Sequence, residues 1–292
     1  MSTAPSSVPP PSFGLAPELP EGVERPPPPE RPRWKPWMAW VALVAAFGGA
    51  ILGAVVVGVI GALAGAPFDN PTPAVSISAT ILQDLSFIGA ALLFASMAGT
   101  PRPEQFGLRR TSFWPAVGWI AVAFVGFYVV TLVWVSILGA NPDDTKLPDE
   151  LGVKDSTAAM LAVAFLVAVV APVAEEFFFR GFFFTALRGW KGLWPAAILT
   201  GLVFGAIHVG SAEAVFLPPL AFFGFALCLV YQRTGSLYPC MALHCMNNSV
   251  AFGVSQHWGW ATLLLFVSAL SVISLGALVV RATWTPAPAP AG

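Results

Sequence analysis

Runs of apolar residues long enough to cross a lipid bilayer recur along most of this chain, separated by polar or Pro- and Gly-rich breaks. A helix needs about 20 apolar residues to span a hydrocarbon core of about 30 Å. Eight segments meet or approach that length, and they cover roughly 38–63, 75–98, 113–138, 158–187, 193–210, 214–232, 237–255 and 259–280. The pattern predicts an all-α polytopic membrane protein, built as a bundle of eight transmembrane helices.

The composition supports this prediction. Of the 292 residues, 57% are hydrophobic and 10% are charged, and the mean hydropathy is +0.76, which excludes a soluble domain with a polar surface. The net charge is -1 and no basic run is longer than Arg109-Arg110, so we predict no nucleic-acid partner. The three cysteines lack the spacing of a disulfide framework or a zinc knuckle, and we interpret them as packing residues.

Proline-rich ends flank the hydrophobic region. Residues 1–36 hold twelve of the 28 prolines and almost no apolar run, so they are predicted to form a disordered cytoplasmic tail. No basic start with a short apolar stretch precedes Trp37, so the first apolar segment is expected to remain as a membrane anchor. The prediction is therefore a membrane domain over 37–283, followed by a short disordered tail over 284–292.

Positive charges in the connections predict the orientation, because loops rich in Lys and Arg stay on the cytoplasmic side. With the first tail inside, the inner connections hold eleven Lys or Arg residues and the outer ones hold two, Lys146 and Lys154. Those two lie in an acidic outer loop over 139–157. We therefore predict a multi-pass protein of the plasma membrane, with both termini cytoplasmic and membrane lipids as its surroundings.

Three ionisable residues interrupt the fourth apolar segment: Glu175, Glu176 and Arg180. An ionisable group at the centre of a spanning helix costs about 2.5–3.5 kcal/mol on insertion scales, so these residues need partners or a function. Glu176 and Arg180 are four residues apart, so they lie on one helix face and can neutralise each other. Glu175 points about 100° away from Glu176. It is either a hydrogen-bonded structural acid or, as we favour, a general base.

Two histidines lie within other apolar segments. His208 follows Phe204 by four residues, and His244 precedes Asn248 by four and shares its helix face. A single histidine in a helix bundle is more often a hydrogen-bonded core residue than a catalyst, but two of them beside other polar groups favour a site. Together with Glu175 they supply a base, two imidazoles and a carboxamide, which suit peptide hydrolysis.

Three motifs stand in chain order on successive predicted helices: Glu175-Glu176-x-x-x-Arg180, Phe204-x-x-x-His208 and His244-x-x-x-Asn248. In order and spacing they resemble the CPBP family, the CAAX proteases and bacteriocin-processing intramembrane endopeptidases. The resemblance covers about 155–255, which would be the catalytic core. It implies an eight-helix bundle with an intramembrane catalytic cavity open to the cytoplasm. It also implies a membrane-associated or lipid-modified peptide or protein as the substrate.

The resemblance further implies a role for each motif residue. Glu175 and His208 would hold and deprotonate a water, and His244 and Asn248 would stabilise the tetrahedral oxyanion. The enzyme would be a hydrolase, a glutamic or metallo-endopeptidase of the CAAX type. The supporting residues would be Glu176, Arg180 and Phe204.

The residues alone do not decide whether the site binds a metal or how deep in the membrane it lies. The preferred glutamate mechanism requires no cofactor; if a divalent metal such as zinc binds, its ligands would be Glu175, His208 and His244. The HExxH motif of the common zinc helix is absent. Counting 1.5 Å per residue from the predicted helix ends places Glu175 and His208 at different depths. They meet only if one of those ends is shifted.

Two other functions are consistent with the same residues. In a proton-coupled transporter, Asp84, Glu175 and the histidines would form a relay, although the repeated halves common in transporters are not found here. The second alternative is a non-catalytic immunity or scaffold protein of the same fold. For Asp84 itself we favour a structural role over a contact with the site or a separate proton acceptor. The substrate sequence and the oligomeric state stay open.

Overall fold

The computed structural model describes residues 32, 34–139, 151, 153 and 156–284. Most of the two predicted disordered tails and most of the acidic loop over 139–157 lie outside the described residues. Within the described ranges the chain is helical apart from turns and connections. This confirms the predicted all-α fold class.

Each of the eight predicted segments is present as a helix or a continuous helical run. Their bounds are α1 Pro36–Leu63, α2 Pro73–Ser96, α3 Phe113–Leu138, the fourth run Thr157–Lys191, α8 Leu193–Ala206, α9 Leu217–Thr234, α10 Tyr238–Ser255 and α11 Ala261–Thr283. The short helices η1 (Pro103–Phe106) and η4 (Ala214–Phe216) lie in connections. In the described part of the chain, six runs are long and apolar enough to cross a membrane, all except α8 and α10. The chain is therefore a multi-pass membrane protein.

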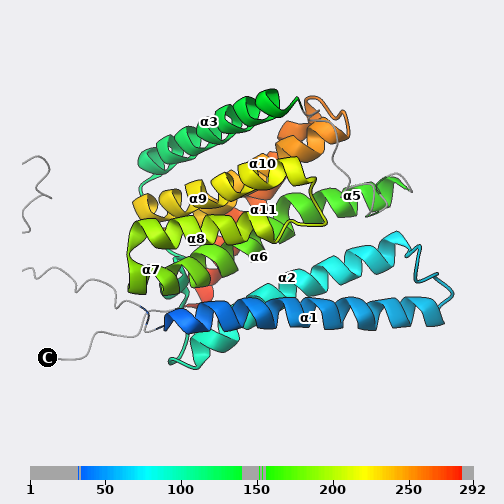
Figure 1. The fold of residues 1–292 in the computed structure, drawn as a ribbon, viewed down its shortest axis with the longest axis horizontal. Helices are drawn as coiled ribbons and strands as arrows, with labels where there is room; N and C mark the ends of the chain where they lie inside the picture. The colour runs from blue at the N-terminus through cyan, green and yellow to red at the C-terminus, as the bar shows by residue number, and fades with distance from the viewer. Residues whose placement is uncertain (1–31, 33, 140–150, 152, 154–155, 285–292) are drawn as a thin grey trace, which may run out of the picture. The chain divides into compact units, whose positions relative to one another are not determined.

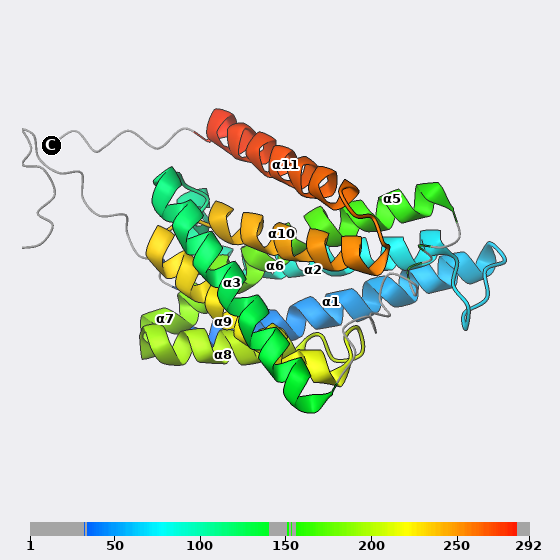
Figure 2. The same ribbon diagram turned by 90° about the horizontal axis from the view of Figure 1, so that it is seen from above.

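The fourth run and α9 lie inside the bundle, whereas α1, α3 and α11 lie at its edge. In the most apolar window of the fourth run 44% of residues are buried, and the same holds for the run that contains α9, against 6% in α1 and in α11. Figure 1 shows α1 and α2 as an antiparallel pair on one side and α3 on the opposite side. Figure 2, turned by 90°, shows α11 along the edge of the bundle. The apolar surface of these outer helices suits contact with lipid tails.

The fourth run changes its helical winding four times. It comprises α5 (Thr157–Phe165), the π-helix η2 (Leu166–Val170), α6 (Ala171–Glu176), the π-helix η3 (Phe177–Phe184) and α7 (Thr185–Lys191). Glu175 and Glu176 form the end of α6, so a π-helical turn flanks them on each side. π-Helical turns are rare, and they frequently occur at functional sites.

A tight turn at Gly192 removes the predicted difference in depth between Glu175 and His208. The fourth run continues to Lys191, four residues beyond the predicted end at 187, and α8 begins at Leu193. Gly192 has φ 78°, a left-handed value that favours glycine. Glu175 lies 17 residues before this glycine and His208 lies 16 residues after it. Along two antiparallel helices that meet at the turn, both residues reach similar depth.

Aromatic side chains fill the space around the glutamates. The fully buried phenylalanines of η3 are Phe178, Phe179, Phe182, Phe183 and Phe184. Phe178 packs edge-on against Phe87 of α2 with ring centroids 5.0 Å apart, and Phe179 packs against Phe204 of α8 at 5.4 Å. These contacts fix the rotation of the fourth run between α2 and α8, and so they direct the glutamate side chains.

Candidate active site

Glu176 connects the fourth run to α10. Arg180 Nη1 donates to Glu176 Oε1 at 2.8 Å, and His244 Nδ1 lies 2.8 Å from the same oxygen. The side chains of Glu176 and Arg180 are both fully buried, and that of His244 is 4% exposed. An ionised carboxylate only accepts hydrogen bonds, so we assign the proton to Nδ1 of His244. Glu176 thus has a second partner, on another helix, beyond the predicted pairing with Arg180.

Arg180 extends this network to α8 and α9. Its Nη2 donates to the backbone carbonyl of Gly224 at 3.0 Å, and its guanidinium lies 4.5 Å from the centre of the Phe204 ring. A Cβ atom on Gly224 would lie 2.7 Å from Cβ of Phe204, so only glycine allows this approach. The buried charge of Arg180 is therefore compensated by a carboxylate, a carbonyl and an aromatic face.

Glu175 lies on the other side of His244. Its Oε2 is 4.0 Å from His244 Nε2, and its side chain is 15% exposed. The same oxygen is buried and has no hydrogen-bond partner among the described residues. A separation of this size is longer than a direct hydrogen bond, and a bridging water can span it. Oε2 of Glu176 also lacks a partner among the described residues, but that side chain is fully buried and its Oε1 binds Arg180 and His244. Glu175 is therefore the more accessible carboxylate of the pair.

Phe204 separates the two histidines. Its ring centre lies 5.0 Å from that of His208 and 5.6 Å from that of His244. His208 follows the end of α8, and its Nδ1 lies 2.7 Å from the backbone carbonyl of Phe204. Because a carbonyl only accepts, Nδ1 carries the proton and the neutral ring keeps Nε2 as an acceptor. Among the described polar contacts, none joins His208 directly to Glu175.

Asn248 contacts the fourth run before the glutamates rather than beside them. Its Nδ2 donates to the backbone carbonyl of Val167 at 2.9 Å, and its Oδ1 accepts from Asn247 Nδ2 at 3.2 Å. Val167 belongs to the π-helix η2. The spacing on one helix face predicts that Asn248 and His244 act together, but the bond to Val167 was not predictable from it.

Asp84 of α2 belongs to the neighbourhood of Glu175. The residue is 2% exposed, and one carboxylate oxygen, Oδ2, has no hydrogen-bond partner among the described residues. It lies close enough to Glu175 for the two carboxylates to interact electrostatically. From the sequence we favour a structural role for Asp84. A sequence pattern identifies a buried polar residue but does not show which helix lies opposite it, so the proximity of Asp84 to Glu175 could not be predicted.

The conditional metal ligands do not form one ligand set. In the ranges that the structure describes, no three His, Cys, Asp or Glu side chains are arranged to hold one metal ion. Glu175 and His244 stand beside each other, but His208 is turned by its Nδ1 contact to the Phe204 carbonyl. The set Glu175, His208 and His244 therefore does not fit a shared ion as arranged.

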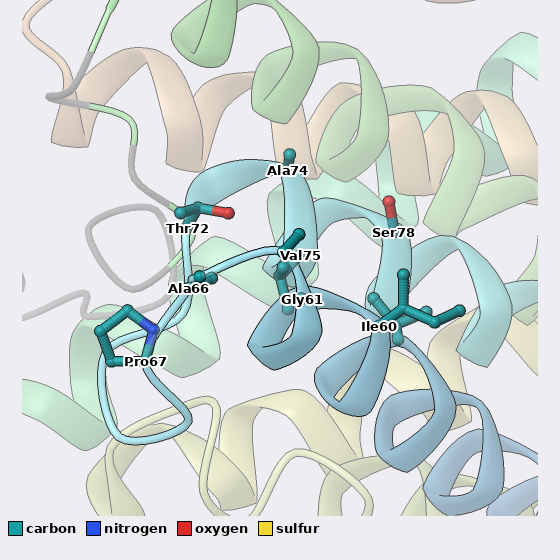
Figure 3. Close-up of a pocket in the computed structure, with 11 residues that line it drawn as sticks. Ile60, Gly61, Ala66, Pro67, Thr72, Ala74, Val75 and Ser78 are labelled. Carbon is teal, nitrogen blue, oxygen red and sulfur yellow. The ribbon is translucent and has the colours of Figure 1, made fainter.

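A pocket lies away from these residues, at the hairpin between α1 and α2. Figure 3 shows it lined by small and apolar side chains. The labelled residues are Ile60, Gly61, Ala66, Pro67, Thr72, Ala74, Val75 and Ser78. No predicted site residue lines this pocket.

Asp84→Asn is expected to raise the thermal stability of the protein. The amide keeps the shape of the carboxyl group and cannot ionise, so it avoids the cost of a desolvated charge in this buried position beside Glu175, a cost of about 1–3 kcal/mol. The measurement is the unfolding midpoint in detergent, with Glu104→Gln on η1 as the control for loss of a carboxylate elsewhere. A lower midpoint for Asp84→Asn would mean that the carboxylate is required structurally.

Comparisons with known proteins support the family resemblance. Residues 157–250 match the model of a family described as type II CAAX prenyl endopeptidase, Rce1-like. This range contains every motif residue, and the match confirms the resemblance predicted from the motifs. An uncharacterized 24.3 kDa protein of Escherichia coli is 29% identical over 147 residues, which cover 49% of this chain and 64% of that protein. The matched part of the chain thus covers slightly less than two thirds of the length of that curated relative. No solved structure matches the chain.

Proposed function

We propose that this chain, whose residues 157–250 match the model of the Rce1-like family of type II CAAX prenyl endopeptidases, is an intramembrane endopeptidase that uses a glutamate-activated water. The observation that carries the proposal is the placement of Glu175. Its unpartnered Oε2 lies 4.0 Å from His244 Nε2, and His244 is itself held by Glu176. A carboxylate oxygen without a partner beside an oriented imidazole supplies the base and the donor of a hydrolytic site.

Glu175 and His208 would prepare the water. The neutral His208 ring keeps Nε2 as an acceptor, which can receive one hydrogen of the water and orient it. Glu175 then removes a proton as the water oxygen attacks the carbonyl carbon of the peptide bond. A positioned carboxylate is a common general base, which suits Glu175 to this step.

His244 would stabilise the negative charge that develops on the carbonyl oxygen. In its protonated form Nε2 carries a hydrogen directed at the space beside Glu175, while Nδ1 keeps its bond to Glu176. Asn248 would contribute a second donor. When the tetrahedral intermediate collapses, the C–N bond breaks and Glu175 returns its proton to the leaving amine. The products are a carboxylate and an amine.

Glu176 and Arg180 would act through His244. The shared contact at Glu176 Oε1 holds the imidazole in one orientation and one tautomer. This is the role that a buried carboxylate has beside a catalytic histidine in other hydrolases. Phe204 would support the arrangement, because its ring packs against Arg180 and both histidines.

The substrate would be a membrane-associated or lipid-modified peptide or protein that reaches the site from the cytoplasmic side. Positive charges in the predicted inner connections support cytoplasmic termini, and we propose the plasma membrane as the location. Lipids would cover the exposed apolar faces of α1, α3 and α11.

The function is tested by comparing membrane-associated peptides from cells that carry the wild-type chain with those from a Glu175→Ala strain. We expect uncleaved precursors to accumulate in the variant and the matching products to be present only in the wild type, as measured by mass spectrometry. Identical peptide profiles, with both proteins at equal levels in the membrane, would overturn the proposal.

A further inference from the structure

Pro172 interrupts the backbone hydrogen bonding of the fourth run three residues before Glu175. In the π-helix η2 an N–H group bonds the carbonyl five residues earlier, and the N–H of Ala171 donates to the carbonyl of Leu166. The next pair in this register would be the N–H of residue 172 and the carbonyl of Val167. Proline has no N–H. The carbonyl of Val167 therefore lacks its helical donor.

Asn248 supplies a donor from another helix. Its Nδ2 lies 2.9 Å from the carbonyl oxygen of Val167, although the two residues are 81 positions apart in the sequence. A backbone carbonyl at membrane depth needs an internal partner, because water is not available to replace it. The carboxamide is held at its other end too, since Asn247 Nδ2 donates to Asn248 Oδ1.

The register of η2 determines the direction of Glu175. A helix that lost the π-helical turn would advance by one residue relative to its neighbours. Each residue of an α-helix corresponds to a rotation of about 100°. A shift of that size would turn Glu175 away from His244 and exchange the environments of the two adjacent glutamates.

We propose that Asn248 is a positioning residue for the glutamate helix: it binds the carbonyl that Pro172 leaves without a donor, and so holds the turn that places Glu175 beside His244. The Nδ2 group has two hydrogens, so one stays available for the oxyanion. This inference rests on the proposed function for its effect on cleavage. The interaction between Asn248 and the Pro172 region is independent of that function.

A double-mutant cycle of Pro172→Ala and Asn248→Ala in the full chain tests the proposal. In the chain with Pro172, Asn248→Ala is expected to lower the unfolding midpoint in detergent by roughly 2–4 °C. In the Pro172→Ala background the shift should be less than half as large, because the new backbone N–H bonds the Val167 carbonyl. The loss of peptide cleavage caused by Asn248→Ala should likewise be smaller in that background, by about tenfold.

The control is Ser249→Ala, which changes a buried neighbour on α10 and should shift the midpoint equally in both backgrounds. Asn248→Leu gives a second test that keeps Pro172: its side chain has nearly the shape of asparagine but no donor, so it should behave as Asn248→Ala. Equal midpoint shifts by Asn248→Ala in both backgrounds, or a wild-type midpoint for Asn248→Leu, would overturn the inference. A further outcome is that the effect of Asn248→Ala on the midpoint depends on Pro172 as expected while the wild type and the Glu175→Ala strain show the same peptides. In that case the proposed function fails and the inference about Asn248 stands.

Discussion

Replacing Glu175 with alanine is expected to abolish peptide cleavage by folded protein in the membrane. Oε2 of Glu175 has no hydrogen-bond partner among the described residues and lies beside His244 Nε2, whereas Glu176 is held through its Oε1 by Arg180 and His244. Loss of a general base lowers a rate by about 10²–10⁴-fold. His208→Ala is expected to have an effect of the same kind, because the water loses its second acceptor. The measurement is the cleavage rate of an accumulating precursor peptide by purified protein in lipid vesicles.

The matched control for this prediction is Glu104→Gln, which removes a carboxylate from η1, outside the glutamate cluster. It should cleave at the wild-type rate. The unfolding midpoints of Glu175→Ala and His208→Ala should stay within a few degrees of the wild type, so that a loss of rate reports on chemistry. Full activity of Glu175→Ala would remove the hypothesis that this residue is the base.

Arg180→Met is expected to cause the largest loss of stability among single substitutions in the cluster. It leaves the fully buried carboxylate of Glu176 without its positive partner and the carbonyl of Gly224 without a donor. Breaking a buried ion pair by removing one partner costs about 3–5 kcal/mol. The free energy of unfolding in detergent, measured by denaturant titration, should fall by that amount.

Two variants make this prediction specific. Arg233→Met removes an exposed arginine that packs on Trp119, and it should cost only about 0.5–1 kcal/mol. Adding Glu176→Gln to Arg180→Met removes the unpaired charge and should restore part of the lost stability. An Arg180→Met variant as stable as Arg233→Met would contradict the account of Glu176 and Arg180 as a compensated buried pair.

The sequence predicts much of the fold because lipid imposes a length on each apolar run. The predicted segment over 113–138 coincides with α3, and the segment over 237–255 begins one residue before α10. The fourth run differs, since it continues to Lys191 rather than ending at 187. Arg188 and Lys191 end the apolar pattern but not the helix, because basic residues are favourable in the last turn of a helix. That extension is what brings Glu175 and His208 to similar depth.

The site is predictable only where its contacts are local. The four-residue spacing of Glu176 and Arg180 predicts their ion pair, because such residues are neighbours on a helix. The bond between Glu176 and His244 joins residues 68 positions apart, and no periodicity encodes it. The same applies to Asp84 beside Glu175 and to Asn248 on Val167. The two π-helical turns could not be predicted from the sequence either, because they depend on packing around Pro172 and the phenylalanines of η3.

The most direct test of the central claim uses water labelled with ¹⁸O. Membranes that contain the wild-type chain or Glu175→Ala are incubated in this water, and the membrane-associated peptides are then analysed by mass spectrometry. The account predicts new carboxyl termini that carry ¹⁸O in the wild type and are missing from Glu175→Ala, because Glu175 drives the attack of a water on the peptide carbonyl. The same labelled termini in both membranes, or in neither, would contradict it.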